Sequence, residues 1–502
     1  MACAIAAAVA LRVWILASPI GRADSDEAVV GLMARAILDG HRPVFFWGQS
    51  YGGTLEPGVV AVVFAVVGSS SAALKAVPVA LAGVSALLVW RVARRTANAV
   101  VAPLAGALFL LYPPAFVWWS TKERGFYWIG LISALSVVLF ALRTVERLPR
   151  PRLLDLAGLG FAAGLAWWTS PQTMFVVAPV VVWLVWRAGR DVVRCWPTLP
   201  AAVLGASVWL WWNPRHGWRS LRSPPGTQPS TYLERVRLFF ARLLPTTLGV
   251  RRPFTGTWLL GPVGVVLYIA VLAAFAMFVV RTARHGDRAS PTTLLLGISV
   301  VYPFLFAVPA SSYYVDEPRY ALMLAPIIVL LACRYLVSPR RQWIALAVAV
   351  ALAGSTVATT IDFAHDTPSR LDLARPALAP LRTTLDRLHI DRVFADYWLA
   401  YPLTFVTDER ITASPIDSVR STALHERVAA APKSTYVVLR DSANDRALTA
   451  ALRERRVRYR KVTVARFAVY LLATRLVPAE LPTLMRLRPP ALDHAPLRVA
   501  TR

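Results

Sequence analysis

The chain has 502 residues, of which 56% are hydrophobic, and its mean hydropathy of +0.51 excludes a wholly water-soluble protein. In a soluble protein a formal net charge of +27 would suggest a nucleic-acid partner. Here much of the arginine excess falls in short loops between apolar segments, where cytoplasmic positive charge is expected, so we expect no nucleic-acid partner. The cysteines Cys3, Cys195 and Cys333 predict neither a disulfide framework nor a metal site.

Apolar segments of near-bilayer length predict a polytopic all-α membrane protein with about eleven transmembrane helices. The first, from Ala2 to about Ile20, lacks a basic start, which favours a retained span over a cleaved signal peptide. The run Pro57–Val67 is too short to span and is expected to be interfacial or re-entrant. The other expected spans are 72–90, 100–117, 126–142, 153–168, 171–187, 197–212, 257–280, 291–309, 320–337 and 342–360.

Two kinds of loop alternate between these segments. One kind is arginine-rich, as at Arg91/Arg94/Arg95 and Arg187/Arg190/Arg194, and the positive-inside rule places it in the cytoplasm. The N-terminus is then cytoplasmic, and the loop 21–56 and the part after residue 361 are extracytoplasmic. Most acidic and aromatic residues of the membrane region fall in loops on this outer side.

The first external loop, 21–56, holds the carboxylates Asp24, Asp26 and Glu27 before a predicted interfacial helix that Gly40 ends. A polar, glycine-rich stretch follows, with Gln49, Tyr51 and Glu56. Asp24 and Glu27 also have the spacing of a helix capping box, so a purely structural role is an equal alternative for them.

After residue 361 the composition becomes soluble, and alternating strands and helices predict an extracytoplasmic α/β domain over 361–477. The expected strands are 392–398, 435–439 and 462–472, and the expected helices are 371–388, 418–431 and 445–455. Residues 1–360 form the membrane domain in this interpretation. Residues 478–502 are rich in proline and arginine, and we expect a disordered tail.

Acids and cations on one outer face suit glycosyl transfer from a lipid-linked sugar phosphate. A carboxylate takes the proton of the attacking acceptor hydroxyl, and cationic side chains stabilise the phosphate leaving group. For Lys122 and Arg124 the structural alternative is a solvated turn. For Arg215 and His216 it is headgroup anchoring, and for Arg319 a snorkelling side chain.

Six short motifs follow one another along the chain: Asp26-Glu27, the stretch from Phe46 to Glu56, Gly164–Gln172, Trp212–Trp218, Glu317-Pro318-Arg319-Tyr320 and Ala395-Asp396-Tyr397-Trp398. Together they resemble the GT-C superfamily of integral-membrane glycosyltransferases, and within it the glycosyltransferase family 39 type. This type includes protein O-mannosyltransferases and the lipid A aminoarabinose transferase. The chain departs from many relatives in having Gly-Gly-Thr-Leu-Glu-Pro where they carry a His/Lys-Pro-Pro segment.

The resemblance implies a polyprenyl-phosphate sugar donor, an extracytoplasmic lipid, glycan or protein acceptor, and inversion at the anomeric carbon. It implies Asp26 as the base, with Glu27 or Asp24 positioning the acceptor or a divalent cation. No cofactor is required by the sequence; Mg²⁺ or Mn²⁺ held by Asp24 and Asp26 is the option left open. Candidate substrate-binding residues are Lys122, Arg124, Arg319, Arg215, His216, Gln49, Tyr51, Glu56 and Tyr320.

We therefore expect a glycosyltransferase of the bacterial plasma membrane. Two alternatives come from other classes, a transporter or flippase of lipid-linked glycans and a non-catalytic envelope scaffold. A transporter would have charges near the middle of several spans and repeated halves, and neither is evident.

Overall fold

The computed structural model describes residues 2–97, 99, 101–222, 230–253, 256–285, 290–310, 312, 315, 318–336, 342–370 and 377–487. The chain divides into two compact units. The membrane unit comprises Met1–Gly21, Ser50–Glu56 and Ala76–Asp366. The C-terminal unit comprises Arg22–Gln49, Pro57–Lys75 and Thr367–Arg502, so most of the first external loop groups with it rather than with the membrane helices.

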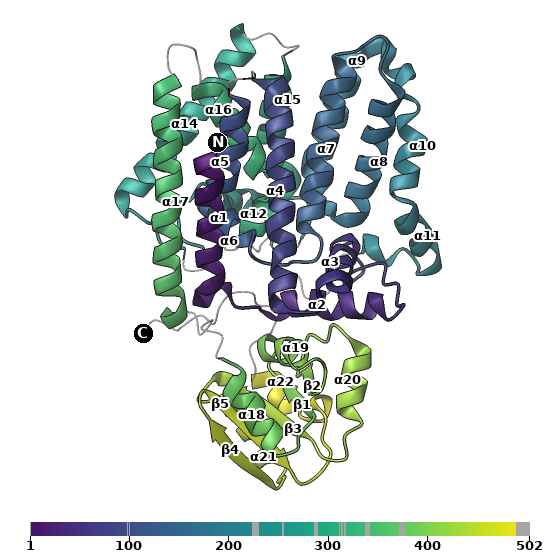
Figure 1. Ribbon diagram of the computed structural model, residues 1–502, viewed down its shortest axis with the longest axis vertical. Helices are drawn as coiled ribbons and strands as arrows, with labels where there is room; N and C mark the ends of the chain where they lie inside the picture. The colour runs from purple at the N-terminus through teal and green to yellow at the C-terminus, as the bar shows by residue number, and fades with distance from the viewer. Residues whose placement is uncertain are drawn as a thin grey trace. The chain divides into compact units, whose positions relative to one another are not determined.

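The membrane unit is helical, and Figure 1 labels most of its helices. Among the described residues, five helices are long and apolar enough to cross a membrane, namely Ser71–Thr96, Tyr127–Val145, Pro171–Cys195, Pro262–Arg284 and Leu346–His365, and six apolar helices are shorter. These helices confirm the expected multi-pass membrane protein. The principal helices are α1 (Ala2–Ala17), α4 (Ser71–Thr96, which begins in the C-terminal unit), α5 (Ala102–Leu111), α6 (Pro114–Trp119), α7 (Tyr127–Val145), α8 (Leu153–Thr169), α9 (Met174–Ala188), α10 (Thr198–Gly205), α11 (Ser207–Arg215), α12 (Tyr232–Leu238), α13 (Leu244–Thr247), α14 (Pro262–His285), α15 (Pro291–Phe306), α16 (Ala325–Leu336) and α17 (Gln342–Arg370).

Glycines let α8 and α10 approach closely, and the two helices lie side by side in Figure 1. A Cβ atom at Gly160 would lie 2.0 Å from the Thr198 carbonyl oxygen, and one at Gly164 would lie 2.0 Å from that of Ala202. Small residues four positions apart are a common device for packing membrane helices, because the backbones then meet directly.

The C-terminal unit holds a five-stranded sheet in the order β2-β1-β3-β5-β4. Its strands are β1 (Arg392–Ala395), β2 (Thr412–Pro415), β3 (Thr435–Leu439), β4 (Tyr459–Val464) and β5 (Phe467–Leu472). Strand β1 pairs in parallel with β2 and β3, while β5 runs antiparallel to β3 and β4. This arrangement confirms the expected α/β domain.

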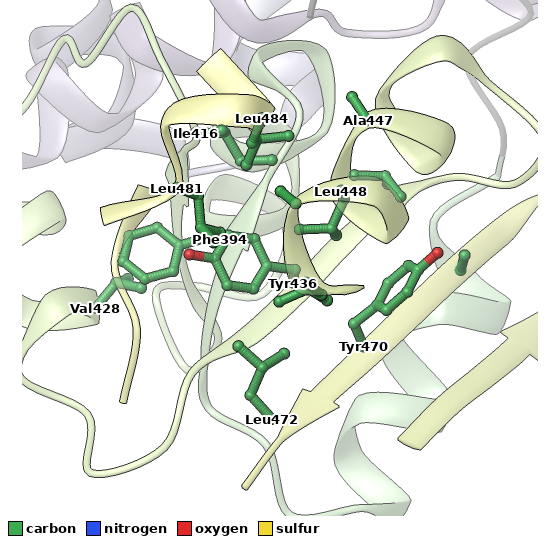
Figure 2. Close-up of a cluster of buried hydrophobic side chains, with 14 residues drawn as sticks. Phe394, Ile416, Val428, Tyr436, Ala447, Leu448, Tyr470, Leu472, Leu481 and Leu484 are labelled. Atoms are coloured by element: carbon green, nitrogen blue, oxygen red, sulfur yellow. The ribbon is translucent and has the colours of Figure 1, made fainter. Parts of the chain in front are cut away.

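Helices cover both faces of this sheet. Residues of α20 (Thr422–Ala429), α21 (Ala443–Glu454) and α22 (Pro482–Leu487) pack on one face around Phe394, Tyr436 and Tyr470 (Figure 2). Residues of α18 (Ala379–Arg387) and α19 (Tyr397–Val406) pack on the other face around Val393, Val437 and Val469. Both faces are apolar because helices cover both of them.

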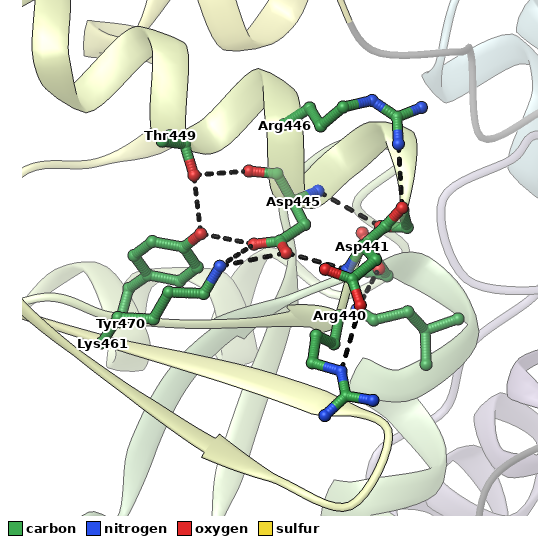
Figure 3. Close-up of polar contacts among 10 residues, drawn as sticks. Arg440, Asp441, Asp445, Arg446, Thr449, Lys461 and Tyr470 are labelled. Atoms are coloured by element: carbon green, nitrogen blue, oxygen red, sulfur yellow. Dashed lines mark hydrogen bonds and ion pairs between the residues drawn. The ribbon is translucent and has the colours of Figure 1, made fainter.

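A buried polar network ties α21 to the β4–β5 hairpin. The Asp445 carboxylate accepts hydrogen bonds from the Tyr470 hydroxyl, from Lys461 Nζ at 3.0 and 3.1 Å, and from the Asp441 backbone N–H at 2.9 Å (Figure 3). Burial alone would raise the pKa of the Asp445 carboxyl, but the hydrogen bonds from Tyr470, Asp441 and Lys461 together lower it. The carboxylate is therefore satisfied inside the fold.

Three expectations for this domain are wrong. The strand expected at 392–398 ends at Ala395, because the helix α19 begins at Tyr397. Neither α19 nor the strand β2 was among the expected elements. The strand expected at 462–472 is the hairpin β4–β5, turning at Ala465 with a φ of 49°. Residues 478–487 are ordered, because Leu481 and Leu484 enter the core and form α22; residues 488–502 of the expected tail lie outside the described part.

Candidate functional site

The acidic motif of the first loop begins the helix α2 (Ser25–Leu38). Asp24 is its N-cap: Asp24 Oδ1 accepts the Glu27 backbone N–H at 3.1 Å, and Glu27 Oε2 accepts the Asp24 backbone N–H at 3.1 Å. This is the reciprocal capping box that the spacing suggested as a structural alternative. Asp24 and Glu27 thus have a structural role whatever else they do.

Glu27 has a second partner in Lys75, at the start of α4. Lys75 Nζ lies 2.6 Å from Glu27 Oε1, and the two side chains are 8% and 0% exposed. A buried ion pair is strongly destabilised when one partner is removed, because the other charge then stays buried without compensation. Both oxygens of Glu27 are engaged, which makes Glu27 a weaker candidate for proton transfer than Asp26.

Asp26 contacts the C-terminal sheet domain instead. Its Oδ1 accepts a hydrogen bond of 2.6 Å from the Tyr397 hydroxyl, and its neighbour Ser25 donates from Oγ to the Tyr397 carbonyl oxygen. Burial and the charge of Asp26 raise the pKa of Tyr397 well above its usual value, so the phenol stays neutral and remains the donor. The acid of the first loop is thereby fixed by a tyrosine at the first position of α19.

Arg420 adds a positive charge to this group. Its Nη1 donates to Gln49 Oε1 at 3.1 Å, and its Nε lies 3.4 Å from the Tyr397 hydroxyl oxygen. The guanidinium carbon lies 5.7 Å from the centre of the Phe46 ring. Gln49, a predicted substrate-binding residue, is thus joined to Asp26 through Arg420 and Tyr397. We call Asp26, Tyr397, Arg420 and Gln49 the Asp26 network.

Two helices running in the same direction position this network. Gly31 of α2 lies against Phe405 of α19, where a Cβ atom would come within 2.5 Å of the ring. One turn further, Arg35 pairs with Asp408 at 2.7 Å. Asp26 and Tyr397 stand near the N-termini of α2 and α19, so both helix dipoles favour negative charge at the Asp26 carboxylate.

The membrane unit holds a second acidic group. Glu56 Oε2 accepts the backbone N–H groups of Trp128 and Ile129 at 3.0 and 3.2 Å, in the first turn of α7. Burial raises the pKa of the Glu56 carboxyl, and the neighbouring Glu123 and the backbone N–H groups offset part of that rise. Glu56 thus caps α7, and its predicted contact with substrate remains a prediction.

The predicted phosphate-binding cations are buried. Lys122 is 0% exposed and Arg124 6%, and each lies over a tryptophan ring: Lys122 Nζ is 5.7 Å from the centre of Trp118, and the Arg124 guanidinium carbon 5.3 Å from that of Trp119. Arg319, 7% exposed, lies over Tyr320 at 5.1 Å. The solvated turn considered for Lys122 and Arg124 is therefore wrong. Asp316 and Glu317, which precede Arg319, lie outside the described residues.

The glycine-rich stretch meets another of the quoted motifs within the membrane unit. The Gly53 backbone N–H donates to the Thr169 carbonyl oxygen at 2.9 Å, and a Cβ atom at Gly53 would lie 3.1 Å from the Thr169 Cα. Tyr51, two residues earlier, makes an edge contact with Phe126 at 6.3 Å between ring centres. The loop thus lies directly on the end of α8.

Arg215 and His216 are both exposed and contact their own helix. Arg215 Nη1 donates to the Trp211 carbonyl oxygen at 2.7 Å, and the His216 ring stacks on Trp212 at 4.0 Å. These contacts are typical of side chains that anchor a membrane protein at the headgroup level, and they favour that alternative over a phosphate contact.

The divalent cation left open by the sequence would be held by Asp24 and Asp26, and one oxygen of each carboxylate already has a hydrogen-bond partner. Asp24 Oδ1 is engaged in the helix cap and Asp26 Oδ1 by the Tyr397 hydroxyl. The described residues contain no group of three or more histidine, cysteine, aspartate or glutamate side chains that could hold a metal ion.

Three residues of these groups were not among the sequence-derived candidates. Lys75 could have been suspected, since it is a lone lysine in an apolar run. Tyr397 belongs to a quoted motif but was expected in a strand. Arg420 gives no local signal, because only the packing of α19 beside α2 gives it a role.

The sequence of the chain was compared with models of known protein families and with curated proteins. Residues 57–212 match the family model described as dolichyl-phosphate-mannose-protein mannosyltransferase. No curated protein matches the chain by sequence.

The fold is similar to that of ArnT from Cupriavidus metallidurans. The apo structure of ArnT is 14% identical, with a TM-score of 0.63 over 92% of this chain and 96% of ArnT. ArnT bound to undecaprenyl phosphate gives a TM-score of 0.59 at 14% identity over 94% and 97% of the two chains. The apo oligosaccharyltransferase of Archaeoglobus fulgidus gives 0.52 at 13% identity over 89% and 71%. These matches show an ArnT-like fold, and they confirm the expected helical membrane domain with a C-terminal α/β domain.

Proposed function

We propose that this protein is a membrane glycosyltransferase that moves a sugar from a polyprenyl-phosphate donor to an extracytoplasmic acceptor, with Asp26 as general base. The observation that carries the proposal is the Asp26 carboxylate, which accepts a hydrogen bond of 2.6 Å from the neutral Tyr397 hydroxyl in the first turn of α2. The fold shared with ArnT, which has been seen with bound undecaprenyl phosphate, supports a lipid phosphate as the donor.

In the proposed reaction an acceptor hydroxyl oxygen attacks the anomeric carbon of the donor sugar. The bond from that carbon to the phosphate oxygen breaks, the electron pair leaves with the lipid phosphate, and Asp26 takes the proton of the hydroxyl. Attack opposite to the leaving phosphate inverts the anomeric configuration. The Tyr397 hydroxyl orients the carboxylate, and Arg420 with the two helix N-termini keeps it ionised until it takes the proton.

The leaving phosphate needs cationic donors as charge develops on its oxygens. Lys122, Arg124 and Arg319 are proposed for this role because burial strengthens the interaction of their charges with an anion. Arginine also presents a planar fork that matches two phosphate oxygens. The aromatic rings beneath the three cations limit their movement.

We further propose that the protein lies in a bacterial plasma membrane, with the N-terminus in the cytoplasm and the C-terminal domain outside. The arginine-rich loops support this orientation. A lipid, glycan or protein acceptor would then meet the Asp26 network on the outer side.

The test uses the full-length protein in lipid nanodiscs with a panel of polyprenyl-phosphate sugars and an envelope extract as acceptor. Wild type is compared with Asp26→Asn, and Asp39→Asn, an exposed acid at the end of the same helix, is the matched control. Binding of undecaprenyl phosphate is measured in parallel by native mass spectrometry.

We expect Asp26→Asn to lose transfer by about a thousandfold or more while keeping donor binding, and Asp39→Asn to resemble wild type. Equal transfer by Asp26→Asn and wild type would remove Asp26 as the base. Absence of transfer with every donor from a folded wild-type sample would instead favour the transporter or scaffold.

A further inference from the structure

Five exposed arginines lie between the end of α21 and the edge strand β4. They are Arg453, Arg455, Arg456, Arg458 and Arg460, and we call them the arginine turn. None of the five forms an ion pair with any described residue of the chain. The one acid among them, Glu454, accepts a hydrogen bond from the Thr483 hydroxyl. The nearby Lys461 forms an ion pair with Asp445 (Figure 3).

The backbone of the turn favours glycine at its centre, yet the chain has arginine there. The Val457 backbone N–H donates to the Leu452 carbonyl oxygen and that of Arg456 to Arg453, which is the Schellman arrangement at a helix end. Arg456 has a φ of 53°, in the left-handed region where glycine is the preferred residue. The turn would form more readily with glycine, so its geometry does not explain the arginine.

The strand that follows is at the edge of the sheet. In the described residues β4 pairs with β5 alone, and Arg458 and Arg460 alternate with Tyr459 so that they project on one face. Charged residues at an edge also discourage pairing with other chains. That role calls for one or two charges on the strand, and it does not account for the three arginines at the helix end.

Arginine forks pair well with phosphate and carboxylate oxygens. A membrane-binding basic surface is commonly joined by exposed large apolar side chains that enter the headgroup region. In residues 377–487 the exposed large hydrophobic side chains are Val406 and Met485, and neither belongs to the turn. A linear run of arginines without an apolar anchor suits a soluble polyanion better than a lipid surface.

We propose that the arginine turn binds an anionic glycan, a polymer whose phosphate or carboxylate groups repeat along its length. The proposal rests on the proposed glycosyltransferase function in one respect, since it names an anionic class of acceptor for that reaction. Binding itself requires no turnover and can be measured separately.

The test measures binding of poly(glycerol phosphate) and polygalacturonate to the full-length protein in nanodiscs of neutral lipid, with dextran as the uncharged probe. The variant is Arg456→Gly with Arg458→Gln. The control is Arg410→Gln with Arg427→Gln, which removes the same charge from arginines paired with Asp386 and Glu409. Phosphatidylglycerol vesicles test for a lipid surface, and thermal unfolding reports folding.

We expect wild type to bind at least one polyanion and not dextran, with affinity that falls as salt rises. The variant should bind about fivefold more weakly, as expected for two exposed charge contacts, while the control stays close to wild type. Arg456→Gly alone should unfold no earlier than wild type, because glycine relieves the left-handed backbone.

Equal weakening in variant and control would overturn the proposal, as would absence of polyanion binding or binding to vesicles alone. The Asp26→Asn variant distinguishes this proposal from the proposed function. If it binds the glycan as wild type does but neither it nor wild type transfers sugar, the glycan site stands and the proposed reaction fails.

Discussion

Asp26 and Tyr397 lie 371 positions apart in the sequence and share a hydrogen bond of 2.6 Å. The bond joins the acid after the first apolar helix to α19, the helix that follows strand β1 of the C-terminal sheet domain. The position of a carboxylate in the first external loop thus depends on a residue of the C-terminal domain.

Replacing Tyr397 with phenylalanine should weaken transfer about tenfold and move the acid limb of the pH–rate profile to higher pH. Loss of the hydroxyl donor disfavours the ionised Asp26 carboxylate, so a higher pH is needed to keep it ionised. The pH dependence of kcat/KM checks this expectation. Tyr436→Phe is the control, since its hydroxyl donates to the Leu476 carbonyl oxygen in the domain core; an acid limb that moves equally in both variants would contradict the role of Tyr397.

Replacing Lys75 with methionine should destabilise the protein by roughly 3–5 kcal/mol, because the Glu27 carboxylate then stays buried without its partner. Adding Glu27→Gln should recover much of this loss, since glutamine also completes a capping box. Thermal unfolding and sugar transfer are measured for both variants. If the stable double variant fails to transfer sugar, Glu27 takes a direct part in the reaction.

Replacing Gly31 with alanine should loosen the packing of α2 on α19, because the new Cβ would lie 2.5 Å from the Phe405 ring. Overpacking of this kind costs about 1–3 kcal/mol. Hydrogen exchange of both helices should rise, and Phe405→Leu should restore protection. Gly58→Ala is the control, since a Cβ atom there meets nothing within 4 Å; equal exchange in the two alanine variants would contradict the close contact.

Acidification should release α21 from the β4–β5 hairpin. The folded-state pKa of Asp445 lies below its unfolded value, so its contribution to stability is present above the unfolded pKa and is lost as pH falls through the folded pKa. Asp445→Asn should lose about 1–3 kcal/mol at neutral pH and show less pH dependence below pH 4. Hydrogen exchange of α21 and β5 across pH 3 to 7 checks this, and parallel curves for wild type and variant would refute it.

Chelation should leave sugar transfer unchanged. Arg420 donates to the Tyr397 hydroxyl, which in turn donates to the Asp26 carboxylate. The arginine therefore supplies a positive charge near Asp26, and the carboxylate does not depend on a bound cation for neutralisation. Transfer rates are compared before and after EDTA treatment and after adding back Mg²⁺ or Mn²⁺. A loss that either ion restores would place a metal in the reaction.

The sequence by itself determined the properties that depend on local pattern. Apolar segment length predicted the membrane helices, and the Asp24/Glu27 spacing predicted the capping box, because both follow from neighbours a few residues apart. The strand at 435–439 was predicted with its correct bounds, since it is a continuous β-branched and aromatic run. Patterns that depend on a distant partner were less reliable, as the helix at Tyr397 shows.

The tertiary structure alone decided which acid of the first loop stands apart. In the sequence, Asp24, Asp26 and Glu27 are near equivalents. In the folded protein Glu27 forms an ion pair with Lys75, whereas Asp26 accepts a hydrogen bond from the Tyr397 hydroxyl. Folding also buries Lys122 and Arg124, for which a solvated turn was the structural alternative to a phosphate contact. The physical reason is that hydrogen bonds and burial between residues hundreds of positions apart arise only when helices such as α2 and α19 pack, and no local periodicity records that contact.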